Sequence, residues 1–187
     1  MALKDNQKKM LMGGAVAFIM IMSTFAIVLN YATEPPSTIQ YLDYKFKQTR
    51  QGYVTEIDGE EQSFFALPSD VDMIPISETA KSLLTADKYI VAYDPQSEYA
   101  EQMAEAQFML EQNLKGIERA LTNSTGTAVP QKNCEDGTSQ KPVIIFQQAN
   151  ETRIESDGAC IQAQYVDDYD LFREEELLRY KILGVIE

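Results

Sequence analysis

The residues of this chain best placed to do chemistry form an acidic group near its end. Asp167, Asp168 and Asp170 are followed about one helical turn later by Glu174–Glu176. Several carboxylate oxygens so close together could hold Ca²⁺. The EF-hand spacing is absent, because the glycine after the third acid and the glutamate in register are missing. Acids at the start of a helix also cap free N–H groups and complement the helix dipole. We therefore interpret this group as a helix N-terminus and assign no metal ligand.

The sequence contains no histidine, which removes the commonest general base and metal ligand. The Ser-His-Asp and Cys-His arrangements are excluded with it. The chain also lacks a Walker-type loop, a GxGxxG motif and an HExxH motif. An enzyme built on this chain would resemble the glycosidases in working with carboxylates held at a set separation, and no such pair stands out. We assign no catalytic residue and no cofactor.

The two cysteines, Cys134 and Cys160, match neither a CxxC motif nor a zinc-ligand pattern. An even number of cysteines outside the cytoplasm favours a structural disulfide. A disulfide between them would close a loop of about 27 residues and contribute about 3.5 kcal/mol in the chain-entropy model. Two sequons begin at Asn123 and Asn150, and both fall in polar connections where a glycan could be attached.

The stretch from Met10 to Leu29 carries no charged residue. At about 1.5 Å per residue, a helix over this stretch would cover the roughly 30 Å of a bilayer's hydrocarbon core. Lys4, Lys8 and Lys9 precede it, so the positive-inside rule places the N-terminus in the cytoplasm and the rest of the chain outside the cell membrane. A cleaved signal peptide is the alternative, although no small-x-small cleavage site follows the apolar run.

These features predict an α/β (α+β) fold, with an N-terminal transmembrane helix followed by one extracytoplasmic domain whose mixed sheet is packed by helices. The expected parts are a cytoplasmic N-terminus (1–9), a transmembrane anchor (10–30), a linker (31–39), a β-meander (40–68) and an α/β domain (69–187). The net charge of −13 repels phosphate backbones, so we expect no nucleic-acid partner. The expected partners are the lipid bilayer, through the N-terminal helix, and a protein of the envelope.

Periodicity and turn signals predict the elements within the domain. The meander strands are expected at 41–47, 53–57 and 63–67, with Asp58-Gly59 as a hairpin turn. Further strands are expected at 73–76, 89–93, 142–146, 152–155 and 159–163. Helices are expected at 77–86, from Asp94 and Pro95 to Leu121, and at 168–185, with Ser77 and Asp94 as N-caps.

From about Asp72 onward this order of elements resembles that of thioredoxin-like proteins. Pro142 opens the strand after the long helix, and a hairpin and a terminal helix follow it. Where that family carries its redox cysteines, this chain has Pro75-Ile76-Ser77-Glu78-Thr79, so the resemblance implies a fold without the family's thiol chemistry. The anchor-plus-domain layout also resembles uncharacterised single-pass archaeal membrane proteins.

The sequence as a whole favours a non-catalytic, membrane-anchored extracytoplasmic protein with a binding or assembly role in the cell envelope. One alternative is a thioredoxin-like extracytoplasmic protein whose site is inactive or exchanges the disulfide of Cys134 and Cys160. A carboxylate-based hydrolase is a third hypothesis.

Overall fold

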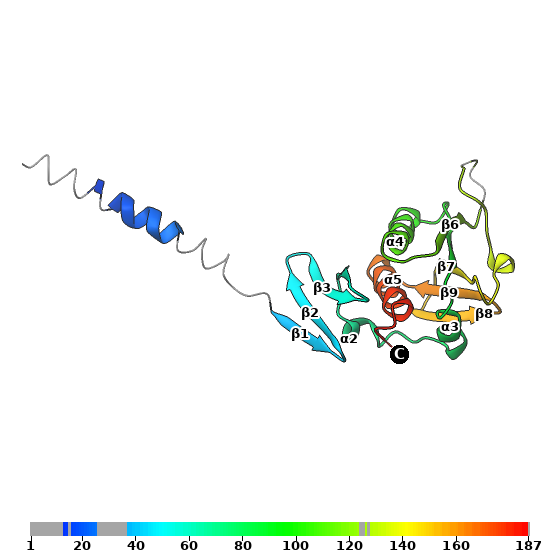
Figure 1. Cartoon of the computed structure of the whole chain (residues 1–187). Coiled ribbons are helices and arrows are strands. Elements are labelled where there is room, and N and C mark those ends of the chain that lie inside the picture. Colours follow the sequence, from blue (N-terminus) through cyan, green and yellow to red (C-terminus); the bar gives the residue numbers. More distant parts are fainter. Residues whose placement is uncertain (1–12, 15, 26–36, 124–125, 127, 187) are drawn as a thin grey trace, which may run out of the picture. The chain divides into compact units, whose positions relative to one another are not determined.

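The computed structural model describes residues 13–14, 16–25, 37–123, 126 and 128–186. The chain divides into two units, Met1–Ser37 and Thr38–Glu187. In the first unit, residues 16–25 are helical (Figure 1). Among the described residues no helix has both the length and the apolar character needed to cross a bilayer. The predicted anchor at 10–30 therefore gains no support, and much of it, at 10–12, 15 and 26–30, lies outside the described residues.

The second unit begins with an antiparallel meander, in which four strands pair in chain order. These are β1 (Thr38–Tyr41), β2 (Tyr44–Thr49), β3 (Gly52–Ile57) and β4 (Glu60–Phe64). The predicted hairpin is confirmed, because Asp58 and Gly59 both adopt positive φ and Ile57 pairs with Glu60. The first predicted strand is interrupted at Leu42, whose φ of 48° opens a turn between β1 and β2. Phe46, Ile57 and Phe64 bury one side of the meander in the core.

The remainder is a mixed α/β layer, which confirms the predicted class of sheets packed by helices. Its helices are α2 (Pro68–Val71), α3 (Glu78–Leu83), α4 (Ala100–Asn113), the 3₁₀ turn η1 (Cys134–Asp136) and α5 (Asp168–Ile182). Its strands are β5 (Tyr89–Tyr93), β6 (Ile117–Leu121), β7 (Val143–Gln148), β8 (Arg153–Asp157) and β9 (Cys160–Tyr165). They lie in the order β6-β5-β7-β9-β8, with only β8 antiparallel to its neighbour.

The single long helix predicted up to Leu121 is wrong. Helix α4 ends at Asn113, and the chain returns as β6, parallel to β5. The reversal occurs at Gly116, whose φ is +80° and where an added Cβ would lie 2.3 Å from the Asp87 carbonyl oxygen. A side chain could not occupy this turn, so the glycine fixes the change from helix to strand. The apolar residues of β6 happen to continue the helical spacing of those in α4, so the two elements looked like one helix in the sequence.

Two further predictions at element boundaries are also wrong. Asp94 does not cap the helix; its Oδ1 accepts a hydrogen bond from the Gln96 amide, and α4 begins only at Ala100. The predicted strand at 73–76 is reduced to one bridge between Ile76 and Ile154. By contrast, the N-cap at Ser77 is confirmed, since its side chain accepts a hydrogen bond from the Ala80 amide. The described chain contains no cis peptide bond, including that preceding Pro142.

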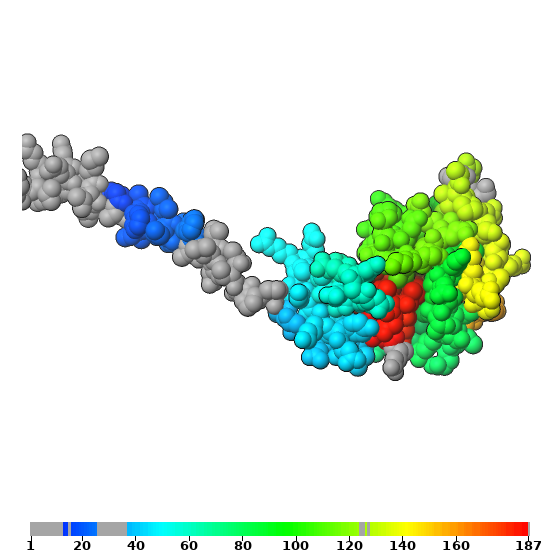
Figure 2. Space-filling view, in the orientation of Figure 1, coloured from blue at the N-terminus to red at the C-terminus, as the bar shows by residue number. Residues whose placement is uncertain are grey.

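Helix α5 is the centre of the packing (Figure 1). It contacts α4, β9 and α2, and its side chains also reach the end of β4. On the face shown in Figure 2, the red C-terminal segment reaches the surface only between the cyan meander and the green segments of the chain. The opposite face of the five-stranded sheet carries a much smaller apolar cluster: Ile90, Ala92, Ala120 and Val143, with Ile145 packed against them. The first four of these residues are also buried, so both faces of the sheet are covered, and the second face has the smaller apolar cluster.

Candidate functional site

The strand order creates a crevice in the five-stranded sheet. From the central strand β5 the chain passes through α4 to β6 on one side, and then crosses to β7 on the other side of β5. In open α/β sheets, ligands bind outside the carboxyl ends of the two strands at such a reversal. A cavity of about 710 Å³ lies at this point, within the size range of small-ligand sites.

The cavity is lined by residues from each element that meets at the crevice. They are Asp94, Ser97 and Glu98 after β5, Met103 of α4, Thr122 after β6, Asn133, Cys134 and Glu135 around η1, and Ile145, Phe146, Gln147 and Gln148 of β7. Of the apolar lining residues, the partly exposed Ile145 gives the floor, whereas Met103 and Phe146 are almost fully buried. The remaining side chains are acids, amides, hydroxyls and one disulfide sulfur. Among these twelve residues there is no lysine or arginine, so the lining has a negative character.

Asp94 is held in place by the loop that follows β5. Its Oδ1 accepts hydrogen bonds from the Gln96 backbone N–H at 2.9 Å and from Asn123 Nδ2 at 3.0 Å. The loop after β6 is tied to the end of β5, because the Thr122 amide donates to the Tyr93 carbonyl. The predicted glycan acceptor Asn123 thus lies beside the crevice with its amide engaged, while the rest of its sequon, Ser124 and Thr125, is outside the described residues.

The predicted disulfide between Cys134 and Cys160 is formed. It ties η1, which lies between Asn133 and Gly137 and includes Glu135, to the first residue of β9. The turn is also held from within: Asn133 Oδ1 accepts a hydrogen bond from the Glu135 amide, and Asp136 accepts one from the Asn133 amide and pairs with Lys132. The backbone of this wall is therefore fixed by a covalent bond and a capping box.

The carboxylates of Glu98 and Glu135 line the crevice without an ion pair or a hydrogen bond to any described residue. Both side chains are exposed to solvent at the cavity mouth. They differ in this from Asp94, whose Oδ1 is already used. Two acids with unused oxygens, set over an apolar floor, can bind a group that carries positive charge or several N–H donors.

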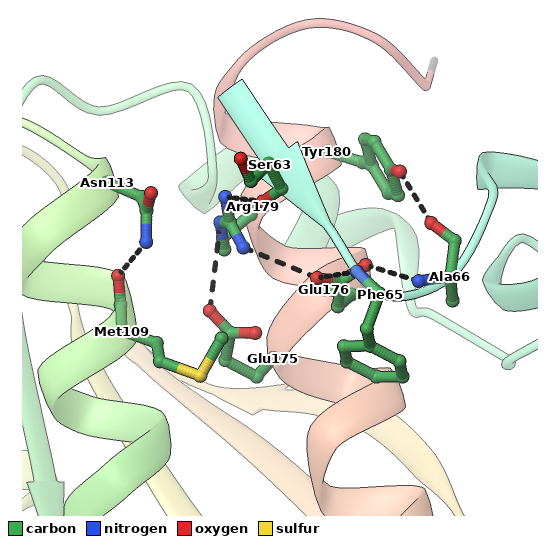
Figure 3. Close-up of polar contacts among 9 residues, drawn as sticks. All are labelled: Ser63, Phe65, Ala66, Met109, Asn113, Glu175, Glu176, Arg179 and Tyr180. Carbon is green, nitrogen blue, oxygen red and sulfur yellow. Dashed lines mark hydrogen bonds and ion pairs between the residues drawn. The ribbon is translucent and has the colours of Figure 1, made fainter. Parts of the chain in front are cut away.

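A second polar cluster joins α5 to the end of β4, and we call it the clasp (Figure 3). Glu176 Oε1 and Oε2 accept hydrogen bonds at 3.1 Å from the backbone N–H groups of Phe65 and Ala66. Arg179 Nη1 lies 3.3 Å from Glu176 Oε1, and Arg179 Nη2 donates to the Ser63 carbonyl at 2.8 Å. The side chains of α5 thus complete the hydrogen bonding of an edge strand.

Aromatic rings close the clasp. Tyr180 donates to the Ala66 carbonyl at 2.7 Å and stacks on Phe64 with ring centroids 4.1 Å apart. The Arg179 guanidinium lies 4.4 Å from the centroid of the same Phe64 ring, which adds a cation–π contact. Both Arg179 and Glu176 are fully buried. Such a pair is strongly destabilising to break from one side, because the remaining charge would stay buried and uncompensated.

Two more buried acids adjoin the clasp on α5. Glu175 Oε1 is 3.8 Å from Arg179 Nε, too far for a hydrogen bond (Figure 3). Glu174 faces the sheet, close enough to Tyr165 of β9 for the two groups to influence each other's ionisation. Neither Glu174 nor Glu175 has a hydrogen bond of ordinary geometry with a described residue, and both are fully buried.

Burial raises the pKa of all three glutamates. The pKa of Glu174 rises to about 9, through burial and then the charge of Asp170, although the backbone N–H of Arg153 opposes part of the rise. Burial raises the pKa of Glu175 to about 8, against the attraction of Arg179. Burial raises the pKa of Glu176 least, to about 7, because Arg179 and the two N–H groups of β4 favour its charged form.

The acidic group at residues 167–176 divides between two roles. Asp167 caps α5 as predicted, since its side chain accepts a hydrogen bond from the Asp170 amide at 3.0 Å. The following glutamates are buried instead of solvated, and no local sequence signal indicates this. The described residues contain no group of acids, histidines or cysteines arranged to hold a metal ion. The second glycan acceptor, Asn150, is exposed in the connection between β7 and β8.

A scan of protein-family models, a search of curated proteins and a search of solved structures found no match to the chain.

Proposed function

We propose that this protein is a non-catalytic, membrane-anchored extracytoplasmic protein that binds a positively charged group of an envelope partner in the crevice at the carboxyl ends of β5 and β7. The observation that carries the proposal is the crevice itself. It sits at the strand reversal, has a cavity of about 710 Å³ and is lined by three carboxylates without a basic residue. The absence of histidine from the sequence favours binding over catalysis.

The anchor and the location rest on the sequence. The uncharged run Met10–Leu29 has the length of a membrane span, and Lys4, Lys8 and Lys9 set the direction of insertion. The disulfide between Cys134 and Cys160 supports an oxidising compartment, because disulfides persist outside the cytoplasm. Protease treatment of intact cells tests this topology. We expect the domain from residue 38 onward to be degraded on intact cells, and protection until the cells are lysed would contradict the proposed orientation.

The crevice suits an alkylammonium or guanidinium group with an apolar stem. Glu98 and Glu135 supply unused carboxylate oxygens, and the stem would lie on the partly exposed Ile145. Charge complementarity of this kind also speeds the encounter of the partners. Because salt screens the charges, the affinity should fall as the salt concentration rises. The natural source of the group is a lysine or arginine side chain of a partner protein.

Titration of the full chain in mild detergent with a tetralysine peptide tests the binding site. The informative variant is Glu98→Gln with Glu135→Gln, and Glu56→Gln with Glu105→Gln is the matched control, because it removes the same charge from exposed positions away from the crevice. We expect saturable binding that weakens at least about tenfold in the crevice variant, which is the effect of losing roughly 1.4 kcal/mol of interaction. Equal weakening in both variants would show only non-specific attraction and would refute the site.

A second candidate function follows from the position of Cys134. This cysteine is partly exposed and lines the crevice, so its disulfide with Cys160 could exchange with the thiol of a bound partner. Thiol titration at graded reduction potentials separates the two functions. A disulfide that opens under mildly reducing conditions would favour exchange, whereas one that resists them would leave binding as the function.

A further inference from the structure

Four buried ionisable residues lie within less than two turns of helix α5. Glu174, Glu175, Glu176 and Arg179 are all fully buried, so the helix core holds three acids and one base. A buried charge is strongly disfavoured unless an opposite charge or hydrogen bonds compensate it. One guanidinium can balance one carboxylate, and two of the acids must therefore carry protons for the packing to persist.

The geometry shows which acid takes the charge that Arg179 balances. Glu176 accepts two backbone hydrogen bonds from β4 and lies 3.3 Å from Arg179 Nη1. Glu175 has no hydrogen bond with a described residue, and its Oε1 is 3.8 Å from Arg179 Nε. Glu176 is therefore the charged member of the pair, and Glu175 is the acid whose ionisation would place a second negative charge beside it.

The clasp is the contact that this second charge would disturb. Arg179 holds the Ser63 carbonyl and the Glu176 carboxylate at once, so any shift of the guanidinium toward Glu175 weakens both contacts. The other ionisable groups around the cluster offer no further positive charge in contact with Glu175. They are Asp170, Arg173 and Tyr180 of α5, Asp70 of α2, Arg153 of β8 and Tyr165 of β9. Arg173 is paired with Asp170 and Arg153 with Glu151 and Glu155, while α4 presents the uncharged Met109 and Asn113.

We propose that the clasp is a proton-dependent latch, which is closed while α5 holds a single carboxylate charge against Arg179 and opens locally at β4 when Glu175 also ionises. The raised pKa of Glu175, about 8, places this transition on the alkaline side of neutrality. Opening releases the Phe65 and Ala66 amides from Glu176 and leaves the five-stranded sheet intact. The meander is then coupled to α5 near neutral pH and partly uncoupled in alkaline surroundings.

Amide hydrogen exchange of the full chain in mild detergent, corrected for the intrinsic effect of pH on exchange, tests the latch. Phe65 and Ala66 report the clasp, and Val91 in β5 reports opening of the central sheet. Between about pH 7 and about pH 9 we expect the protection of Phe65 and Ala66 to fall by about tenfold and to stay well below that of Val91, whose protection follows the global stability of the fold. In Glu175→Gln, which keeps the shape of the protonated acid, the change at Phe65 and Ala66 should be less than about twofold.

Glu105→Gln is the control, because Glu105 is exposed on α4 and its loss changes the net charge alone. It should show the wild-type response. If Glu175→Gln does not fold, Glu175→Met carries the same expectation, since it is uncharged and similar in length. A wild-type response in either Glu175 variant would overturn the proposal, and so would protection at Phe65 and Ala66 equal to that at Val91, which would indicate that the clasp opens only by global unfolding. The crevice and its titration are unaffected by either result.

Discussion

Replacing Glu174 by glutamine should stabilise the protein, and increasingly so as the pH rises. Glu174 is fully buried, and neither of its carboxylate oxygens has a hydrogen bond of ordinary geometry with a described residue. Its pKa is raised from 4.5 in an unfolded chain to about 9 in the fold. The unfolded state therefore releases a proton that the folded state keeps, and ionisation favours unfolding throughout this pH window.

The sign and size of the effect follow from this difference. The contribution of Glu174 to stability is complete below the unfolded pKa of 4.5 and is lost as the pH rises toward about 9. Each unit of pH within the window costs about 1.4 kcal/mol, so the loss is roughly 3 kcal/mol at neutral pH and at most roughly 6 kcal/mol above pH 9. Glutamine matches the shape of the protonated acid and does not ionise, so Glu174→Gln should recover most of this loss.

Urea unfolding of the full chain in mild detergent, followed by tyrosine fluorescence at a series of pH values, measures the effect. We expect the free energy of unfolding of the wild type to fall with rising pH, and the slope to be smaller in Glu174→Gln. The exposed Glu105→Gln on α4 is the control and should keep the wild-type slope. A variant with the wild-type slope, or one that loses stability at alkaline pH, would show that Glu174 is ionised in the folded protein and would refute the reasoning.

Two further substitutions test how the crevice and the sheet are held. Replacing both Cys134 and Cys160 by serine should lower the free energy of unfolding by about 3.5 kcal/mol, because the disulfide joins cysteines that are 26 residues apart in the sequence. An unchanged melting temperature would contradict this prediction. Gly116→Ala should cost at least about 2 kcal/mol, since its positive φ is disfavoured for alanine and the new Cβ would meet the Asp87 carbonyl. Gly158→Ala is the matched comparison, with positive φ but open space around it, and should cost only about 1 kcal/mol; equal losses in thermal melting would show that the contact at Asp87 is unimportant.

Local signals predicted much of the fold. The Asp58-Gly59 turn and the N-cap at Ser77 are each decided by a few neighbouring residues, and both are confirmed. The disulfide followed from the number and spacing of the cysteines. The end of α4 was missed because its apolar residues keep a helical spacing beyond Asn113, and the steric requirement at Gly116 depends on the distant Asp87 carbonyl.

The clasp was beyond sequence reasoning for a different physical reason. Three consecutive glutamates point in three directions around a helix, so a helix in contact with one layer would expose at least one of them. Here α4, the sheet and the end of β4 surround α5, and all three are buried. The crevice likewise depends on β7 crossing to the far side of β5, which no local pattern specifies.

The most direct test of the proposed function is isolation of the protein from its native membranes in mild detergent, with the wild type compared to Glu98→Gln with Glu135→Gln. We predict that a stoichiometric protein partner accompanies the wild type and the Glu56→Gln with Glu105→Gln control, and is lost from the crevice variant. A wild-type chain that comes out alone, or a partner retained equally by the crevice variant, would contradict binding at the carboxyl ends of β5 and β7.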